Sequence, residues 1–286
     1  DLTVLDTSTP SIFNDVAAAE AIKAAVPETK IALVGTHVSA LSEETMRLGA
    51  SVDFICRREY DETLRDLAQR VADRGGFEDV AGLTFRCDGE IRSAPDRPYI
   101  EDLDAIPFVS RTYRKFLDIR NYFNPNALYP MVTIMSGRGC VFKCVFCVYP
   151  QTMTGRRYRL RSVENVVDEM EYIRGEFPKA RSVFFEDDTL TVNRKRCVAL
   201  SEEILRRGLR ISWTANSRAD LDYETMAVMK RAGCRCLCVG FESGDQGVLE
   251  KMHKAMTVEK MAKFSEDARR AGIVVHGCFM VGNPGE

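Results

Sequence analysis

The sequence feature that most constrains the fold is the alternation of short apolar runs with amphipathic segments. In the first block, apolar runs of strand length are separated by segments whose apolar residues recur at helical spacing. Strands are expected at 1–8, 30–35 and 52–56, helices at 14–26, 42–48 and 61–74, and a hairpin with an Asp-Gly turn at 80–92. Alternating strands and helices predict a parallel sheet of the doubly wound type.

A second block of the same kind follows a proline-containing stretch, residues 94–130, which lacks sustained periodicity and indicates a linker. Beyond it, strands are expected at 131–136, 182–187, 210–215, 234–242 and 273–282, with helices at 163–174, 195–207, 223–231 and 258–271. Five strand–helix steps predict a partial TIM-type (β/α) barrel. We therefore expect a domain at 1–93, a linker at 94–130 and a domain at 131–286. Because the chain starts on a strand and stops on a turn, we expect the first domain to be N-terminally incomplete and the second C-terminally incomplete.

Three cysteines, Cys140, Cys144 and Cys147, lie within eight residues directly after the first strand of the second block. No secretory signal precedes them, so free thiols or metal ligands are favoured over disulfides. A structural zinc site normally closes with four ligands in two pairs, and no second pair of matching spacing is present. Three ligands with one open position suit a metal centre that binds substrate. Buried core cysteines, or a zinc site completed from elsewhere, remain the alternatives.

Polar residues follow the later strands of the second block, where barrel active sites assemble. Taken singly, each is as readily a helix cap, a turn or a surface charge. They are Glu186, Asp187 and Asp188 after the second strand, Arg218 after the third, Glu242 and Ser243 after the fourth, and Gly282 and Pro284 after the fifth.

The pattern Cys140-x-x-x-Cys144-x-Phe146-Cys147 resembles the hallmark of the radical SAM superfamily. The resemblance implies that the three cysteines hold a [4Fe–4S] cluster whose fourth iron binds S-adenosylmethionine. It implies cleavage of S-adenosylmethionine to a 5′-deoxyadenosyl radical, driven by an external one-electron reductant of the flavodoxin or ferredoxin type. No catalytic residue is identified beyond the cluster.

The same resemblance implies a binding site for S-adenosylmethionine on the later strands. Phe146 would lie near the adenine, Glu186, Asp187 and Asp188 would hold the amino group, and Arg218 would meet the carboxylate. Glu242 and Ser243 would bind the ribose, and the loop with Gly282 and Pro284 would line the adenine.

The first block resembles a truncated, Rossmann-like cobalamin-binding domain of the B12-dependent class. Two strand-end loops match the places where that fold holds the corrin's nucleotide tail, one with Thr7, Ser8 and Thr9 and one with Gly35, Thr36 and His37. We interpret His37 as a loop residue rather than a cobalt ligand.

The likeness is strongest to the B12-binding radical SAM proteins associated with the cyclitol-ether step of hopanoid biosynthesis. Shared stretches include "TSTPS", "AEAIKAA", "VGFESG" and "GNPGE", whereas Val148-Tyr149 departs from an expected apolar–Trp pair. The resemblance implies transferase or cyclase-type chemistry on an unactivated carbon of a hopanoid or other isoprenoid lipid, with cobalamin as a further cofactor. The alternatives are a B12-dependent radical SAM methyltransferase of another small molecule and, from a different class, a non-catalytic zinc-binding module.

Composition bounds the partners. A net charge of -2 gives no general electrostatic reason to expect nucleic acid. No apolar run approaches the roughly 18 residues of a membrane span, so a cytoplasmic protein is expected, with peripheral membrane contact left open. The one basic run, 156–161, can be a solvated loop or can meet a phosphate or an anionic membrane. Period-two alternation places Cys234, Cys236 and Cys238 on one strand face, where we interpret them as small buried residues.

Overall fold

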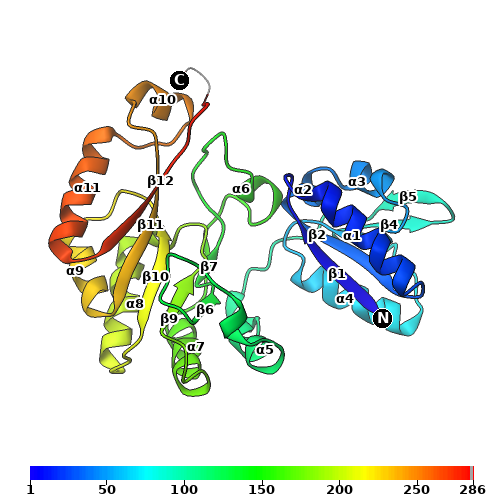
Figure 1. Ribbon diagram of the computed structural model, residues 1–286, viewed down its shortest axis with the longest axis horizontal. Coiled ribbons are helices and arrows are strands. Elements are labelled where there is room, and N and C mark those ends of the chain that lie inside the picture. The colour runs from blue at the N-terminus through cyan, green and yellow to red at the C-terminus, as the bar shows by residue number, and fades with distance from the viewer. Residues whose placement is uncertain (284–285) are drawn as a thin grey trace. The chain divides into compact units, whose positions relative to one another are not determined.

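The computed structural model describes residues 1–283 and 286 and divides into two compact units. The first unit comprises residues 1–100 together with 147–156, and the second comprises 101–146 together with 157–286. In Figure 1 most of the first unit is coloured blue to cyan and most of the second green to red. Among the described residues, no helix is both long enough and apolar enough to span a membrane.

The first unit is built on a five-stranded sheet of order β1-β2-β3-β4-β5. The strands are β1 (Leu2–Thr7), β2 (Lys30–Gly35), β3 (Phe54–Cys56), β4 (Leu83–Cys87) and β5 (Glu90–Ser93). The first three are parallel, as the sequence predicts, but β4 and β5 are antiparallel. The predicted Asp-Gly turn is confirmed: Asp88 and Gly89 both have positive φ, 52° and 82°, as a two-residue hairpin turn requires.

Helices cover both faces of this sheet. The helices are α1 (Ile12–Ala25), α2 (Thr36–Ala40), α3 (Ser42–Leu48), α4 (Asp61–Asp73) and α6 (Tyr149–Thr152). Buried residues of α1, α2 and α3 share one apolar cluster with Ile31 and Leu33 of β2. Leu67 of α4 packs in a second cluster with Ala32 and Val34, which are the alternate residues of the same strand. Successive residues of β2 therefore contribute alternately to two separate cores, one on each face of the sheet.

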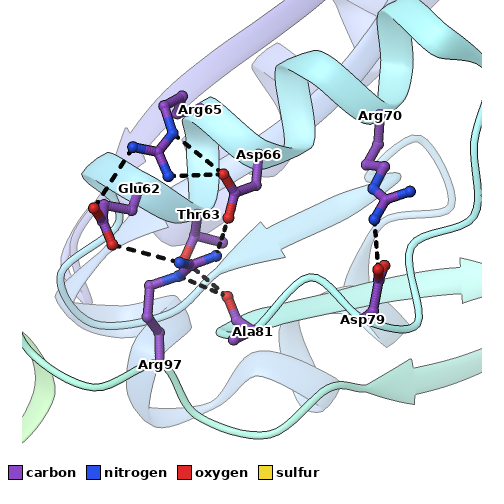
Figure 2. Close-up of polar contacts among 8 residues, drawn as sticks. All are labelled: Glu62, Thr63, Arg65, Asp66, Arg70, Asp79, Ala81 and Arg97. Carbon is purple, nitrogen blue, oxygen red and sulfur yellow. Dashed lines mark hydrogen bonds and ion pairs between the residues drawn. The ribbon is translucent and has the colours of Figure 1, made fainter.

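Arg97 fastens the chain leaving the first sheet to α4 (Figure 2). Its side chain is only 15% exposed, and its Nε donates to Thr63 Oγ1 at 3.0 Å and to the Ala81 carbonyl at 3.1 Å. Its terminal nitrogens contact the carboxylates of Glu62 and Asp66. One guanidinium therefore links a helix, a loop and the departing segment.

Replacing Arg97 with methionine should raise the rate of amide hydrogen exchange along α4 and β4, because buried acceptors lose their donor. Hydrogen bonds to a charged group are worth about 1.5–3 kcal/mol, so we expect local opening to become easier by about that amount. Arg70→Met is the matched control, since Arg70 of α4 makes one exposed ion pair, with Asp79 of the following loop. Equal effects of the two substitutions would contradict the anchoring role of Arg97.

The second unit contains a five-stranded sheet of order β12-β11-β10-β9-β6, in which every described pairing is parallel. The strands are β6 (Met131–Ile134), β9 (Ser182–Phe185), β10 (Ser212–Ser217), β11 (Cys234–Glu242) and β12 (Val274–Phe279). A short ribbon pairs β7 (Gly137–Arg138) with β8 (Arg159–Leu160). The helices are α5 (Val109–Phe116), α7 (Val163–Glu176), α8 (Arg194–Arg206), α9 (Tyr223–Arg231), α10 (Gln246–Lys251) and α11 (Val258–Ala271), with short 3₁₀ turns at Leu103–Ala105, Ile119–Asn121 and Leu190–Val192.

The main core of the second unit lies between the sheet and helices α7, α8, α9 and α11, which lie along one side of it in Figure 1. The single tryptophan, Trp213 of β10, is 1% exposed there and meets Phe185 edge to face. Alternate residues, including Phe184 and Cys238, face the other side, where they pack against Ala127.

The expectation that Cys234, Cys236 and Cys238 share one strand face is wrong for Cys234. Cys234 pairs with Trp213 and Cys236 with Thr214, so two residues of β11 advance against one of β10. Trp213 and Thr214 are successive residues of β10 and face opposite sides of the sheet. Cys234 and Cys236, which pair with them, therefore also face opposite sides. Cys234 belongs to the main core, whereas Cys238 lies in the cluster on the opposite face.

Candidate active site at the carboxyl ends of the parallel strands

Asp187 is the structural centre of the strand-end region. Its side chain is fully buried and accepts hydrogen bonds from Ser136 N and Ser136 Oγ, both at 2.7 Å, and from Tyr158 Oη at 2.9 Å. Burial raises the pKa of Asp187, and these hydrogen bonds oppose the rise. Burial and the neighbouring carboxylate raise the pKa of Tyr158, which keeps its hydroxyl a donor. Asp187 therefore ties the end of β9 to the segment that leads into the cysteine loop.

The cysteine loop is fastened at several points along its length. Gly139, at φ 96°, donates its amide to Asp188 Oδ2 at 2.8 Å, and Val145 donates its amide to the Met252 carbonyl at 3.0 Å. Between these points, the Phe142 ring lies under the guanidinium of Arg218 at 3.6 Å. A loop without regular secondary structure is thereby held in one place.

Arg218 is buried, with 4% of its surface exposed. One terminal nitrogen donates to the carbonyls of Lys254 and Ala255, and Nε lies 3.5 Å from an Asp220 carboxylate oxygen. Nε is the only buried side-chain nitrogen or oxygen without a hydrogen-bond partner in the described part of the chain. Arg218 thus joins the cysteine loop to the segment after α10 and retains one donor.

Glu242 ends β11 in a left-handed conformation, with φ 68°. Its Oε1 accepts a hydrogen bond from the buried Lys254 Nζ at 2.7 Å, and that ammonium lies 5.8 Å from the centre of the Phe146 ring. A Cβ on Gly240 would stand 2.2 Å from Glu242 Oε1, so the glycine makes room for this ion pair. Ser243 is buried, and its Oγ accepts from the Asp245 amide.

The other expected contacts with S-adenosylmethionine differ in accessibility. Glu186 is exposed, and its carboxylate has no hydrogen-bond or ion-pair partner among residues 1–283 and 286. Gly282 has φ 84°, and Pro284 lies outside the described residues. Glu186 is therefore the acidic side chain of β9 that remains open to a ligand, while Asp187 is engaged in the structure.

Cys140, Cys144 and Cys147 form no disulfide within the described part of the chain, and Cys144 is buried whereas the other two are half-buried. Burial raises the pKa of Cys140, against a hydrogen bond from the Phe142 amide. Within the described residues no group of three His, Cys, Asp or Glu side chains is arranged to hold a metal ion as it stands. Cysteine thiolates are the donors that iron–sulfur clusters take, so the chemistry of the three residues fits such a cluster.

The residues proposed for cobalamin lie in the first unit, at the ends of β1 and β2. Thr7 Oγ1 donates to the Val34 carbonyl at 2.7 Å, and His37 Nδ1 lies 3.1 Å from Thr9 Oγ1. Gly35 has φ 109°, and a Cβ there would lie 2.3 Å from the Thr7 carbonyl oxygen. The ends of the two strands are therefore packed closely. Thr36 and His37 lie in α2, so the interpretation of His37 as a loop residue is wrong: the chain turns directly from β2 into a helix at Thr36.

Several residues of this site were not identified from the sequence. Tyr158 and Lys254 lie in loops without periodicity, and their partners Asp187 and Glu242 are 29 and 12 residues away. The basic run 156–161 also proves to be partly internal, since Arg161 is buried against Glu169. No sequence pattern marks these pairs, because each depends on contacts made only in the fold.

A family model described as "Radical SAM superfamily" matches residues 134–286. Among curated proteins, the chain is 31% identical over its whole length to an uncharacterized methyltransferase of Pyrococcus horikoshii, of which it covers 61%. It is 28% identical over 96% of its length to the anaerobic magnesium-protoporphyrin IX monomethyl ester cyclase of Rubrivivax gelatinosus, covering 49% of that protein. It is 26% identical over 90% of its length to the hopanoid C-3 methylase of Methylococcus capsulatus, covering 48%. The chain thus spans about half to three-fifths of these relatives.

Two solved structures share the fold. The radical S-adenosylmethionine methyltransferase TsrM from Kitasatospora setae superposes with a TM-score of 0.79 at 18% identity, covering all of this chain and 57% of that one. The cobalamin-dependent S-adenosylmethionine radical enzyme OxsB, solved with aqua-cobalamin and S-adenosylmethionine bound, superposes with a TM-score of 0.76 at 19% identity. That match covers 98% of this chain and 41% of OxsB. At these identities the likeness is one of fold.

Proposed function

The chain belongs to the radical SAM superfamily, and from this premise we propose that Cys140, Cys144 and Cys147 hold a [4Fe–4S] cluster to which S-adenosylmethionine binds. The observation that carries the proposal is the anchored cysteine loop, whose backbone is hydrogen-bonded to Asp188 at the end of β9. Strand ends of parallel sheets are where ligands of such folds bind. When bound and reduced by an external donor, the cluster would supply the one electron that cleaves S-adenosylmethionine into methionine and a 5′-deoxyadenosyl radical.

The chain's own residues would bind and orient S-adenosylmethionine. The open carboxylate of Glu186 suits the amino group. The Nε of Arg218, which makes no hydrogen bond and only a 3.5 Å ion pair with Asp220, suits the carboxylate. Glu242 and Ser243 would contact the ribose, Phe146 and Gly282 the adenine, with Glu242 held in place by Lys254. Asp187, whose carboxylate accepts three hydrogen bonds from Ser136 and Tyr158, would fix the shape of the site rather than touch the ligand.

We propose cobalamin as a second cofactor, held by the strand-end loops with Thr7, Ser8, Thr9, Gly35, Thr36 and His37. Support comes from OxsB, a cobalamin-dependent enzyme that shares this fold over almost the whole chain. Solvent reaches Ser8, Thr9 and Thr36 of this set, and side chains of this small size would let a nucleotide tail approach closely.

For the reaction, we propose attack on an unactivated carbon of a hopanoid or another isoprenoid lipid. The likeness to a hopanoid C-3 methylase supports this substrate class. The greater identity to an uncharacterized methyltransferase and to a porphyrin-ester cyclase favours, as a second candidate, a methyl transfer or cyclisation on another small molecule.

The test is anaerobic purification of the protein followed by analysis of its metals and of S-adenosylmethionine cleavage. We expect about four irons and four acid-labile sulfides per chain, cobalamin after reconstitution, and 5′-deoxyadenosine when a flavodoxin or dithionite supplies electrons. Zinc without iron or sulfide would overturn the proposal in favour of the zinc-binding module. Lipid extracts of a deletion strain then separate a hopanoid substrate from other substrates.

A further inference from the structure

A group of exposed aromatic side chains lies in the second unit, between the end of α5 and the start of β6. Phe116 is 66% exposed, Phe123 71% and Tyr122 51%. Soluble surfaces carry single exposed apolar residues, but large aromatic rings clustered within eight residues are unusual. No helix or strand of the proposed active site includes them.

The segment that carries these rings is well ordered by its own contacts. Tyr129 donates its hydroxyl to the Arg120 carbonyl, and its ring meets that of Phe123 edge to face at 5.9 Å. The Asp118 carboxylate accepts from the Arg120 amide and caps the turn Ile119–Asn121. The segment that carries the rings is therefore held by defined hydrogen bonds and a ring contact.

The Lys115 ammonium lies 4.8 Å from the centre of the Phe116 ring, and further basic side chains line a hollow of about 380 Å³ at the turn Ile119–Asn121. Arg114, Arg120 and Lys179 line the hollow together with Asp118 and Glu176. Arg114 pairs with Glu176 at 3.5 Å and Arg120 with Asp118 at 2.5 Å, whereas Lys179 makes no ion pair within the described part of the chain. Lys115 and Arg181 are also exposed, so these basic residues outnumber Asp118 and Glu176, although the net charge of the whole chain is -2.

We propose that this aromatic–basic patch (Arg114, Lys115, Phe116, Arg120, Tyr122, Phe123, Lys179 and Arg181) docks the protein on an anionic membrane surface. Aromatic rings favour the interfacial region of a bilayer, and lysine and arginine are attracted to anionic headgroups beside it. Charge argues against a second copy of the chain, because a two-fold contact would set this basic patch against itself. The inference does not depend on the proposed reaction or on the nature of its substrate.

The test is sedimentation of the complete protein with vesicles of phosphatidylcholine, alone or with about one-third phosphatidylglycerol. We expect binding to the anionic vesicles only, weakened by salt and not displaced by inorganic phosphate at equal ionic strength. Lys179→Gln should weaken binding about five-fold. Phe116→Ser with Phe123→Ser should weaken it more than about ten-fold.

Matched controls come from exposed residues elsewhere in the chain. Phe13→Ser removes a phenylalanine that is 75% exposed, and Lys195→Gln removes the same charge as Lys179→Gln. Neither should change vesicle binding, and fluorescence of Trp213 verifies that the second unit of each variant remains folded.

Three outcomes would overturn the proposal: equal loss of binding in the controls, no preference for anionic vesicles, or binding to a single-stranded RNA oligonucleotide in place of vesicles. A dimer that dissociates on Phe116→Ser and Phe123→Ser, without vesicle binding, would instead assign the patch to a second copy.

Discussion

Replacing Cys144 with alanine should abolish both the iron–sulfur chromophore and the cleavage of S-adenosylmethionine. Cys144 is the buried member of the three cysteines. Its loop is fixed on one side by the hydrogen bond from the Val145 amide to the Met252 carbonyl. Mutation of a residue that only supports a metal ligand already lowers metal affinity or activity by about 10–100-fold. Loss of a ligand itself should therefore lower cleavage by more than about a hundredfold. Iron content, the absorbance of the reduced and oxidised protein, and 5′-deoxyadenosine are the measurements.

The control for this variant is Cys87→Ala, which removes a half-buried thiol from the β4–β5 hairpin of the first unit. Full iron content and unchanged cleavage are expected there. Normal cleavage by Cys144→Ala would contradict the assignment of the cluster to this loop. Trp213 fluorescence separates loss of the cluster from unfolding of the second unit, because that residue lies in its main core.

Replacing Glu169 with leucine should strongly destabilise the second unit. Glu169 of α7 is fully buried, accepts from Ser110 N and Ser110 Oγ at 3.1 and 2.8 Å, and pairs with Arg161 at 2.5 Å. Its removal leaves the Arg161 guanidinium buried without its counter-charge. Breaking one side of a buried ion pair typically costs about 3–5 kcal/mol, and we expect the free energy of unfolding to fall by that amount. Urea titration followed by Trp213 fluorescence measures it.

A double variant distinguishes the buried charge from simple loss of packing. Glu169→Leu with Arg161→Met removes both charges and should be more stable than Glu169→Leu alone, since an apolar pair of similar volume replaces the ion pair. Arg161 also donates to the Met135 carbonyl and to Asn165, so recovery should be incomplete. Arg206 of the neighbouring helix provides the control: its side chain is 69% exposed and pairs with Glu203, and Arg206→Met should change little.

The helices of the second unit were predictable where amphipathic spacing coincided with a capping residue. The expected ranges 223–231 and 258–271 are those of α9 and α11. Asp222 accepts from the Thr225 amide at the start of one, and Thr257 accepts from the Lys260 amide at the start of the other. Local hydrogen bonds and local periodicity therefore determine these boundaries.

The stretch interpreted as a linker shows where local patterns end. It contains the helix α5, whose Ser110 is buried by Glu169, a residue 59 positions later. The face exchange of Cys234 similarly depends on a bulge in the pairing with β10, which alternation along one strand does not reveal. Contacts between residues so far apart in the sequence depend on packing between elements rather than on the sequence near each residue.

For the candidate site, position along the sequence places the residues at the carboxyl ends of the strands, but it does not predict the state of each side chain. Glu186, Asp187 and Asp188 are adjacent, yet one is open, one is fully buried and one holds the cysteine loop. Alternation along the strand places Glu186 on the same face as Phe184 and turns Asp187 toward Ser136. The roles of these residues toward S-adenosylmethionine stay predictions.

The grouping of residues 147–156 with the first unit has a consequence for synthesis and for dissection of the gene. The ribosome completes residues 101–146 of the second unit before it releases α6, which belongs with the first. The first unit therefore cannot finish folding when residue 100 emerges, and its last segment arrives late. A gene fragment that ends at residue 100 would also lack Met153, whose sulfur accepts a hydrogen bond from Ser39 Oγ of α2. Expression of the first unit alone calls for a fused or split gene that restores α6.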